Sequence, residues 1–321
     1  MSRASLSDKQ KKSVDNTGFS PNSAAEGRRL VNRDGSTNLR KMGLPFYERI
    51  SIYHSLLRMS RVTFILTVFA IYTSLNILFA SIYFFLGADS LAGSQSATSV
   101  LERYLQAFFF SSQTLTTVGY GHISPVGFVT NVVASIESFI GIMSFALVTG
   151  IFYARFSRPQ AYIRFSHNVL IAPYKRGKAL MFRLATYKNN HLTNAEAEVT
   201  AAVHLTENGK TQTKFYQLTL EMNKINSMAI SWTIVHPLDD NSPFSGFTDQ
   251  DFFEGKLELM VSIRAFDDHF SNTVQQRTSY TQQEMIFGAR FLPMYERSEN
   301  GQYTHVMLNK INDYEVVNFD A

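Results

Sequence analysis

The sequence has no cysteine, and two long stretches of it have almost no charge. The lack of cysteine excludes disulfide bonds, zinc–thiolate sites, iron–sulfur clusters and thiol nucleophiles. Residues 62–88 are 27 positions without Asp, Glu, Lys or Arg, and residues 123–154 are 32 positions with Glu137 as the only charge. About 20 apolar residues in a helix cross the roughly 30 Å hydrocarbon core of a bilayer. We therefore predict two membrane-spanning helices, at residues 61–87 and 126–155.

The distribution of charge predicts the orientation of these spans. Residues 1–61 hold 12 Lys or Arg and 5 Asp or Glu, whereas residues 62–154 hold 1 and 3. Basic residues therefore flank the two apolar stretches on their outer ends. Because Lys and Arg favour the cytoplasmic side of a membrane, we expect an integral protein of the cell (plasma or inner) membrane with both termini in the cytoplasm.

The chain divides into four predicted parts. Residues 1–44 are polar with few large apolar side chains, so we expect a mobile N-terminal tail. Residues 45–58 show one apolar helical stripe, which predicts an amphipathic helix lying at the membrane interface; an ordinary first helix of the soluble part is the alternative. Residues 59–157 form the transmembrane part, and residues 158–321 form a cytoplasmic regulatory domain.

The cytoplasmic part has the pattern of β-strands. Its segments are rich in Val, Ile, Phe, Tyr and Thr and are separated by turn residues such as Asn208-Gly209 and Asn300-Gly301. The predicted strands are residues 161–171, 179–187, 196–205, 213–221, 228–235, 256–266, 273–281 and 285–295. Short strands at this spacing favour a β-sandwich, so the predicted fold class is membrane α plus β.

A shorter apolar segment, residues 100–115, lies between the two spans. It is too short to cross a bilayer, which predicts a re-entrant pore helix. Residues 116–121 follow it and read Thr-Thr-Val-Gly-Tyr-Gly. This string contains the established signature of a potassium selectivity filter, whose backbone carbonyls replace the water around the ion, so the chemistry is taken from known filters. Gly119 and Gly121 lack a Cβ and tolerate the left-handed backbone that inward-pointing carbonyls require.

The filter predicts the ligands of a potassium ion. Carbonyl oxygens of Thr117, Val118, Gly119 and Tyr120, together with the Thr117 hydroxyl, coordinate K⁺, and Gly121 completes the loop. A Gly-rich tight turn is the alternative reading of the string alone. One chain supplies one loop and a ring of ligands needs four, so we expect a homotetramer. Potassium ions apart, no cofactor is predicted, and no nucleic-acid partner.

These features together resemble the inward-rectifier potassium channel family, in particular its bacterial branch. The resemblance extends over residues 33–295. Beyond the filter, it is carried by Tyr-Ala-Arg-Phe-Ser-Arg-Pro at 153–159, Ser-Trp-Thr-Ile-Val-His-Pro at 231–237, Asn-Ser-Pro at 241–243, Ser279-Tyr280 and Phe287-Gly288. It implies that the cytoplasmic sandwich is immunoglobulin-like and that the chain is a gated potassium channel whose β-domain transmits a signal.

The chain departs from the animal members of that family near the filter. Those members carry a Glu in the pore helix and an Arg after the filter that pair, whereas the matching positions here are Gln113 and His122. Glu137 is instead the acid nearest the filter, as in bacterial relatives. A charge facing lipid costs at least about 2.5–3.5 kcal/mol, so Glu137 should face the helix bundle or the pore. We interpret Thr116, Gln113 and Glu137 as support for the filter.

Positions along the second span are predicted to shape the ion path. The resemblance places the cavity at Phe145 and Thr149 and a gate at Tyr153, with an interfacial anchor as the alternative for Tyr153. Strongly rectifying relatives carry an acid at the cavity position that Phe145 occupies here, so weak polyamine block is expected. Gly141 is either a hinge or a site of close helix contact.

Five arginines near the ends of the spans are candidates for binding anionic lipid headgroups. They are Arg49, Arg58, Arg61, Arg155 and Arg158. Animal members continue the Arg-Pro pair with a basic run that binds phosphoinositide, whereas this chain continues with Gln160-Ala161.

Two other functions stay open from the sequence. One is a membrane-anchored β-sandwich that serves as a binding or scaffold protein, and the other is a less selective cation channel. The sequence has no Arg-repeat helix, which excludes a built-in voltage sensor. It also contains none of the short hydrolase, zinc-protease or nucleotide-binding motifs, so we predict no enzymatic site.

Overall fold

The structure is a computed structural model that describes residues 17–19, 29–40, 42–43, 45, 48, 51–94, 99–207, 210–298 and 300–317. The chain forms two compact units. One unit is Met42–Arg158, and the other combines Met1–Lys41 with Pro159–Ala321.

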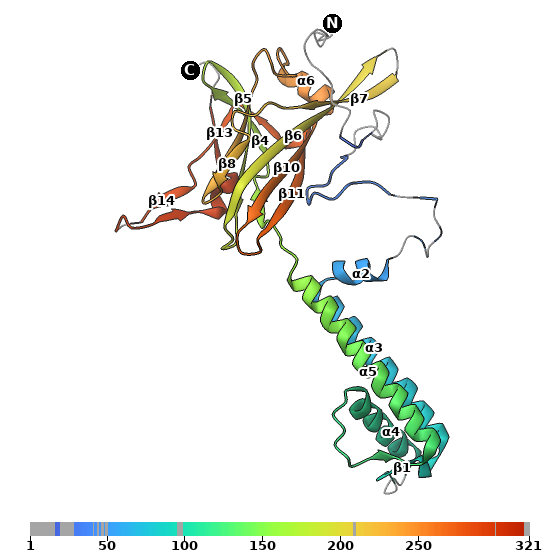
Figure 1. The fold of residues 1–321 in the computed structure, drawn as a ribbon. Coiled ribbons are helices and arrows are strands. Elements are labelled where there is room, and N and C mark those ends of the chain that lie inside the picture. Colours follow the sequence, from blue (N-terminus) through green and yellow to red (C-terminus); the bar gives the residue numbers. More distant parts are fainter. Residues whose placement is uncertain are drawn as a thin grey trace. The chain divides into compact units, whose positions relative to one another are not determined.

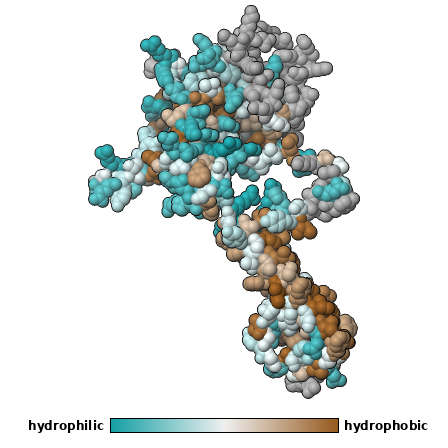
Figure 2. Space-filling model, viewed as in Figure 1, coloured by the Kyte–Doolittle hydropathy of each residue, from teal (hydrophilic) through white to brown (hydrophobic). Residues whose placement is uncertain are grey.

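The unit Met42–Arg158 is built on two long apolar helices, α3 (Arg61–Leu86) and α5 (Gly127–Phe156) (Figure 1). Both are long and apolar enough to cross a membrane. Ser60 begins α3 as its N-cap and accepts a hydrogen bond from the Thr63 backbone N–H. Brown, apolar residues gather over this unit in Figure 2, whereas the visible face of the other unit is largely hydrophilic. The two apolar helices predicted from the sequence are confirmed.

Two shorter helices belong to the same unit. α2 covers Ile52–Arg58 and follows its N-cap Ser51. It lies within the predicted interfacial helix 45–58, and most of the first part of that prediction lies outside the described residues. α4 covers Val100–Leu115 and contacts both α3 and α5. A 3₁₀ turn, η1 (Ala88–Ser90), and a short ribbon of β1 (Leu91–Ala92) with β2 (Ser124–Pro125) bring together the chain that enters α4 and the chain that leaves it.

Apolar packing holds α4 between the two long helices. Phe79 and Tyr83 of α3, Phe110 of α4 and Ala134 of α5 are all buried. The rings of Tyr83 and Phe110 meet edge to face with centroids 5.0 Å apart, a favoured aromatic geometry. This packing fixes the helix that precedes the filter string.

The other unit is a sandwich of two five-stranded sheets. In the first sheet the order is β11–β10–β6–β7 with β8 also paired to β6, and in the second it is β12–β4–β5–β3 with β9 paired to β5. The strands of the first sheet are β6 (Leu192–Glu207), β7 (Lys210–Gln217), β8 (Lys224–Ser227), β10 (Glu258–Asp267) and β11 (Asn272–Thr281). Those of the second are β3 (Ile163–Phe165), β4 (Val169–Tyr174), β5 (Gly177–Thr186), β9 (Ser231–Pro237) and β12 (Met285–Phe287). The predicted β-sandwich is confirmed.

The sandwich core is formed by the facing sides of the two sheets. Phe182 and Ile234 of the second sheet and Leu259 and Ile263 of the first are fully buried in one cluster. Burial alternates along β9, with Trp232, Ile234 and His236 pointing inward. This period of two is the pattern that predicted the strands.

Some strand boundaries differ from the sequence prediction. The single strand expected at 285–295 is divided between β12, β13 (Ala289–Phe291) and the start of β14 (Tyr295–Arg297). Gly288, between β12 and β13, has a φ of 65°, which interrupts an extended strand. Further pieces are β15 (Thr304–Val306), paired with β14, and β16 (Tyr314–Val316), paired with β13, together with α6 (Asp249–Glu254), η2 (Gln282–Glu284) and η3 (Leu308–Asn312).

Residues 30–38 form a small hairpin, here called the N-terminal hairpin, although the sequence predicts a mobile tail over 1–44. Val31 bridges Thr37, and the Asn38 N–H donates to the Leu30 carbonyl at 2.9 Å. Leu30 is 3% exposed. Gly35 has a φ of 82°, and a Cβ there would lie 2.6 Å from the Arg277 carbonyl oxygen of β11. This stretch is ordered in the structure because distant strands supply the partners that its own composition lacks. Most of the rest of the predicted tail lies outside the described residues, and its mobility stays a prediction.

Candidate ion pathway

The filter string adopts an alternating backbone directly after α4. Thr117, Gly119 and Gly121 have φ values of 61°, 53° and 77°. Left-handed residues therefore stand at every second position, which turns successive carbonyls toward one side of the chain. The sequence predicts this conformation for the two glycines. It does not reveal Thr117, where a β-branched residue in the left-handed region is strained.

The C-terminal end of α4 holds the start of the filter by backbone hydrogen bonds. The carbonyl of Gln113 accepts from the N–H groups of Val118 at 2.9 Å and Gly119 at 3.3 Å, and the Thr114 carbonyl accepts from Thr117 at 3.1 Å. These bonds satisfy carbonyls that a helix end leaves free. The Gln113 carbonyl thus lies against the start of the filter string, and its role as a support for the filter stays a prediction.

Thr116 is also held against α4. Its hydroxyl donates to the Ser112 carbonyl at 2.7 Å. In the single chain, Val118 is 54% and Tyr120 77% exposed. The filter is therefore anchored at its base, while its side chains project away from the rest of this unit.

Glu137 of α5 lies at the centre of a buried polar network that joins three helices. The Tyr83 hydroxyl donates to its Oε2 at 2.6 Å, and Ser111 Oγ lies 2.5 Å from its Oε1. Ser111 Oγ is also 3.1 Å from Asn76 Oδ1. Glu137, Asn76 and Ser111 are each 0% exposed. Glu137 faces the helix bundle, as the energetic cost of a lipid-facing charge predicts.

The site residues predicted from the sequence do not include Asn76, Ser111 or Tyr83. Asn76 is a side-chain amide within a 27-residue stretch free of formal charge, which is a usable signal, because a polar group at that depth needs a partner. Ser111 and Tyr83 carry no such signal, because hydroxyls are common in membrane helices. Only the packing of α4 against α3 and α5 brings the three side chains together.

The predicted cavity and gate residues follow one another along α5. Phe145 is 76% and Tyr153 73% exposed in the single chain, and Thr149 between them is also exposed. At about 100° per residue, Tyr153 is turned roughly 120° around the helix from the buried Gly141. These three positions are therefore free to face an axis or further copies of the chain, whereas Gly141 faces α4.

Gly141 makes a close contact with the end of α4. A Cβ on Gly141 would lie 1.9 Å from the Leu115 carbonyl oxygen. Of the two alternatives for this glycine, the structure contains the close helix contact, and the hinge stays a prediction. Gly150, nine residues later, has open space around the same position.

The five arginine candidates for lipid binding have different surroundings. The Arg155 guanidinium donates to the carbonyls of Leu56 and Met59, the latter at 2.7 Å, and lies 4.6 Å from the centroid of the Phe64 ring. Its charge is therefore engaged within this unit. Arg58, Arg61 and Arg158 are exposed, and Arg49 lies outside the described residues.

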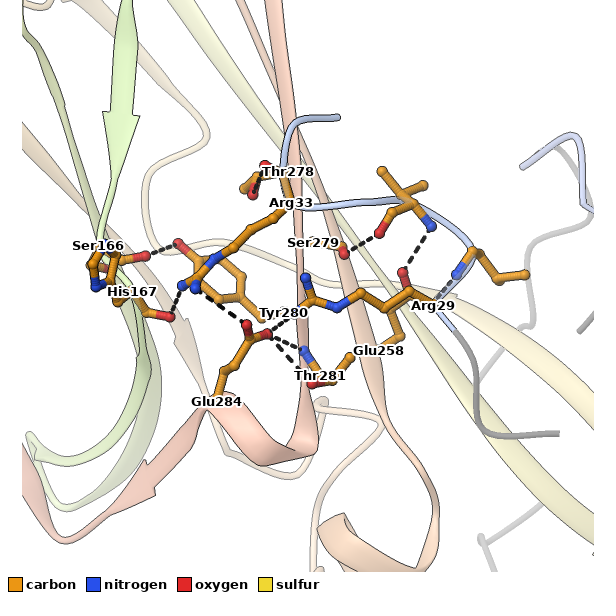
Figure 3. A network of polar contacts seen from close by, with 12 residues as sticks. Arg29, Arg33, Ser166, His167, Glu258, Thr278, Ser279, Tyr280, Thr281 and Glu284 are labelled. Carbon is orange, nitrogen blue, oxygen red and sulfur yellow. Dashed lines mark hydrogen bonds and ion pairs between the residues drawn. The ribbon is translucent and has the colours of Figure 1, made fainter. Parts of the chain in front are cut away.

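In the other unit, the N-terminal hairpin is fixed to the first sheet by side chains that bind its backbone (Figure 3). Glu258 of β10 accepts from the N–H groups of Leu30 at 2.7 Å and Val31 at 3.0 Å. On β11, Ser279 donates to the Val31 carbonyl and Thr278 donates to the Arg33 carbonyl at 2.9 Å. Burial raises the pKa of the Glu258 carboxyl above its ordinary value.

Ionic contacts extend this attachment to the start of the sandwich. Arg29 and Arg33 both pair with Glu284 of η2, and Arg33 also donates to the His167 carbonyl between β3 and β4 (Figure 3). The Tyr280 hydroxyl donates to the neighbouring Ser166 carbonyl at 2.9 Å. The segment that precedes the first span and the segment that follows the second are thus tied to one region of the sandwich.

No group of three or more His, Asp or Glu side chains with the spacing of a metal site occurs in the described part of the chain. His236 of β9 is a structural residue. Its Nδ1 lies 2.7 Å from the Thr219 carbonyl and its Nε2 lies 2.8 Å from Ser242 Oγ. Burial lowers the pKa of its imidazole.

Comparisons with known proteins cover both units. Residues 163–320 match the family described as the inward rectifier potassium channel C-terminal domain, and residues 60–158 match the family described as ion channel. Inward rectifier potassium channel Kirbac3.1 of Paramagnetospirillum magnetotacticum is 30% identical over 276 residues, which are 85% of this chain and 92% of that protein.

More distant relatives match this chain over a smaller part of their length. ATP-sensitive inward rectifier potassium channel 15 of Mus musculus is 28% identical over 208 residues, which are 61% of this chain and 55% of that protein. Among solved structures, the sporulation control protein Spo0M of Bacillus subtilis covers 39% of this chain and 49% of its own at 9% identity, with a TM-score of 0.20. A score this low does not show a common fold.

The bacterial match covers 85% of the chain and 92% of the relative at 30% identity. Both units also match families of channel domains. These are ion channels and not enzymes. The chain therefore belongs to the inward-rectifier potassium channel family, and it is a gated channel that resembles the bacterial members.

Proposed function

We propose that K⁺ passes through a ring of four filter loops and is coordinated by the carbonyls of Thr117, Val118, Gly119 and Tyr120, with Gly121 closing the loop. The observation that supports this most directly is the alternation of left-handed residues at Thr117, Gly119 and Gly121. Such a backbone presents consecutive carbonyls to one line of ions, and neutral oxygen ligands suit a weakly held ion that must also leave.

The same geometry supports a homotetramer. One chain offers one loop, and its Val118 and Tyr120 side chains are exposed when the chain stands alone. Closed cyclic symmetry would bury them against neighbouring copies and place the four loops around one axis. We infer that both termini and the β-sandwich lie on the cytoplasmic side of the cell membrane, because basic residues flank the outer ends of the spans.

Gating is proposed to occur at the cytoplasmic end of α5. Four copies of Tyr153 would form an aromatic ring that can exclude water, with Phe145 and Thr149 lining the cavity above it. Gly141 supplies either the hinge or a fixed contact for this movement.

Among the lipid candidates, the exposed Arg58, Arg61 and Arg158 are best placed to bind anionic headgroups, because Arg155 already has partners within the chain.

Flux through purified protein in liposomes tests the filter. We expect uptake of K⁺ but not Na⁺ by the wild type, and loss of this preference in Gly119→Ala. A Cβ at a φ of 53° is strained, at a cost of about 1–2 kcal/mol. Gly150→Ala is the matched control, because Gly150 has open space around it. Native mass spectrometry of each sample measures the number of chains.

The outcomes separate the competing functions. A tetrameric wild type that carries no ions would favour a membrane-anchored scaffold, and equal uptake of K⁺ and Na⁺ would favour a less selective cation channel. Wild-type selectivity in a folded Gly119→Ala tetramer would refute the role of the filter backbone. Tyr153→Ala should raise basal K⁺ flux, whereas unchanged flux with intact assembly would leave Tyr153 as an interfacial anchor.

A further inference from the structure

The buried network around Glu137 has more oxygen–oxygen contacts than the available hydroxyl hydrogens can bridge when Glu137 is ionised. Its contacts join Tyr83 to Oε2, Ser111 to Oε1, and Ser111 to Asn76 Oδ1, at 2.6, 2.5 and 3.1 Å. The first two distances lie in the usual O–H···O range of about 2.5–3.0 Å, and the third is slightly longer. Each contact needs one proton between its two oxygen atoms, so the network needs three.

The orientation of the Asn76 amide is fixed by a neighbour. Its Nδ2 donates to the Tyr72 carbonyl at 2.8 Å. Turning the amide over would place two acceptor oxygens against each other at that distance. Oδ1 therefore faces Ser111, and Asn76 contributes no proton to the contact with Ser111.

The hydroxyl groups supply only two of the three protons. Tyr83 and Ser111 have one hydroxyl hydrogen each. If Glu137 is ionised, Ser111 must choose between Glu137 and Asn76, and one acceptor with no exposure to solvent is left without a partner. An unpaired polar atom in such a place costs the full desolvation of that group.

An ionised Glu137 would also be an uncompensated charge. The described residues include no Lys, Arg or His paired with it. The contact with Phe110 and the surrounding apolar cluster seal Tyr83 and the helix interface from water. A buried ion without a counter-ion is strongly unfavourable.

We propose that Glu137 is a neutral carboxylic acid, which donates its proton to Ser111, while Ser111 donates to Asn76. The three protons then match the three contacts, and the chain of bonds runs in one direction from α5 through α4 to α3. Asn76 and Ser111 become positioning residues for the pore helix, and Ser111 lies only six residues before Thr117. The filter carries no fixed negative charge behind it in this arrangement.

Infrared difference spectroscopy tests the protonation state directly. The full-length protein, reconstituted in lipid and labelled with ¹³C-carboxyl glutamate, should show the C=O stretching band of a protonated carboxyl near neutral pH. The band should be lost in Glu137→Gln. Glu315→Gln is the matched control, because Glu315 is paired with Arg290 in the other unit, and it should leave the band in place.

Two further variants connect the band to the network. Tyr83→Phe removes the hydrogen bond to Oε2 and should shift the band, and Ser111→Ala removes the acceptor of the acid proton and should shift it as well. A wild type without a protonated-carboxyl band, or a band that Tyr83→Phe and Ser111→Ala leave unmoved, would overturn the proposal even if Glu137→Gln does not fold.

Thermal unfolding in detergent gives a second readout. Gln has the shape of the neutral acid, with an N–H for Ser111 and a carbonyl for Tyr83. Glu137→Gln should therefore unfold at a midpoint close to that of wild type, because no hydrogen bond of the network is lost. A midpoint far below that of wild type in Glu137→Gln would contradict the neutral form. The infrared band does not depend on conduction, so it decides the protonation state even if the filter assignment fails.

Discussion

Gly141 of α5 lies against the last residue of the pore helix, so closely that a methyl group on it would be 1.9 Å from the Leu115 carbonyl oxygen. Backbone meets backbone at this point, with no flexible side chain that could move aside. The close approach of α5 to the base of the filter therefore depends on the lack of a Cβ at Gly141.

Gly141→Ala should destabilise the channel by overpacking, at a cost of about 1–3 kcal/mol. Thermal unfolding in detergent should show a lower midpoint for Gly141→Ala and a midpoint at or above wild type for Gly150→Ala. If both variants unfold like the wild type and Gly141→Ala changes only the open probability, Gly141 acts as a hinge and the contact yields at little cost.

The N-terminal hairpin should be released when Glu258 can no longer accept two backbone N–H groups. In Glu258→Gln one of these groups faces an amide nitrogen, and the loss of a hydrogen bond to a charged acceptor costs about 1.5–3 kcal/mol. Limited trypsin digestion should then cleave after Arg33 faster than in wild type. Glu221→Gln, which removes an exposed ion pair with Lys175, is the control and should digest at the wild-type rate.

The stability of the sandwich should fall in mild acid because of His236. Burial lowers the pKa of its imidazole from the ordinary value of 6.5. Below pH 6.5 the unfolded chain therefore binds a proton at this histidine while the folded protein does not. The free energy of unfolding therefore decreases as pH falls from 6.5 toward the folded pKa and levels off below it. Trp232 is the only tryptophan and lies buried on the same strand, so its fluorescence reports the transition.

His236→Gln should weaken this pH dependence, whereas the exposed His305→Gln should preserve it. His204, whose pKa burial also lowers, contributes in the same direction, so a smaller slope should remain in His236→Gln. A wild-type profile that is flat between pH 7 and mild acid would contradict the prediction.

Block by internal spermine should be weak and only shallowly voltage-dependent. Phe145 offers no charge to a polyvalent cation, whereas four acids facing one cavity attract it strongly at low dielectric. Phe145→Asp should strengthen both the affinity and the voltage dependence, and Phe145→Asn separates charge from size. Current–voltage curves decide the matter: steep wild-type block that Phe145→Asp leaves unchanged would place the cavity position elsewhere.

The features that could be predicted from the sequence are those that depend on the residues of one continuous segment. The spans follow from the lack of charge, the filter follows from its signature, and the burial of Glu137 follows from the cost of a lipid-facing acid. The partners of Glu137 do not follow, because α3 and α4 meet only through tertiary packing. The left-handed Thr117 could not be anticipated either, since a β-branched residue disfavours that conformation.

The N-terminal hairpin shows the same limit in the other unit. Its residues are polar and few, and read alone they cannot offset the entropy of ordering. The carboxylate and hydroxyl groups that order them come from Glu258 and Ser279, more than 200 positions later in the chain. Local composition contains no information about such partners.

Arg155 has a mechanical consequence for α2. Its guanidinium grips the carbonyls at the end of α2 and just beyond, Leu56 and Met59, and it stands two residues after Tyr153 on α5. Charged hydrogen bonds of this kind are worth about 1.5–3 kcal/mol each. The helix α2 and the last turn of α5 are consequently coupled, because neither can shift relative to the other without breaking both hydrogen bonds.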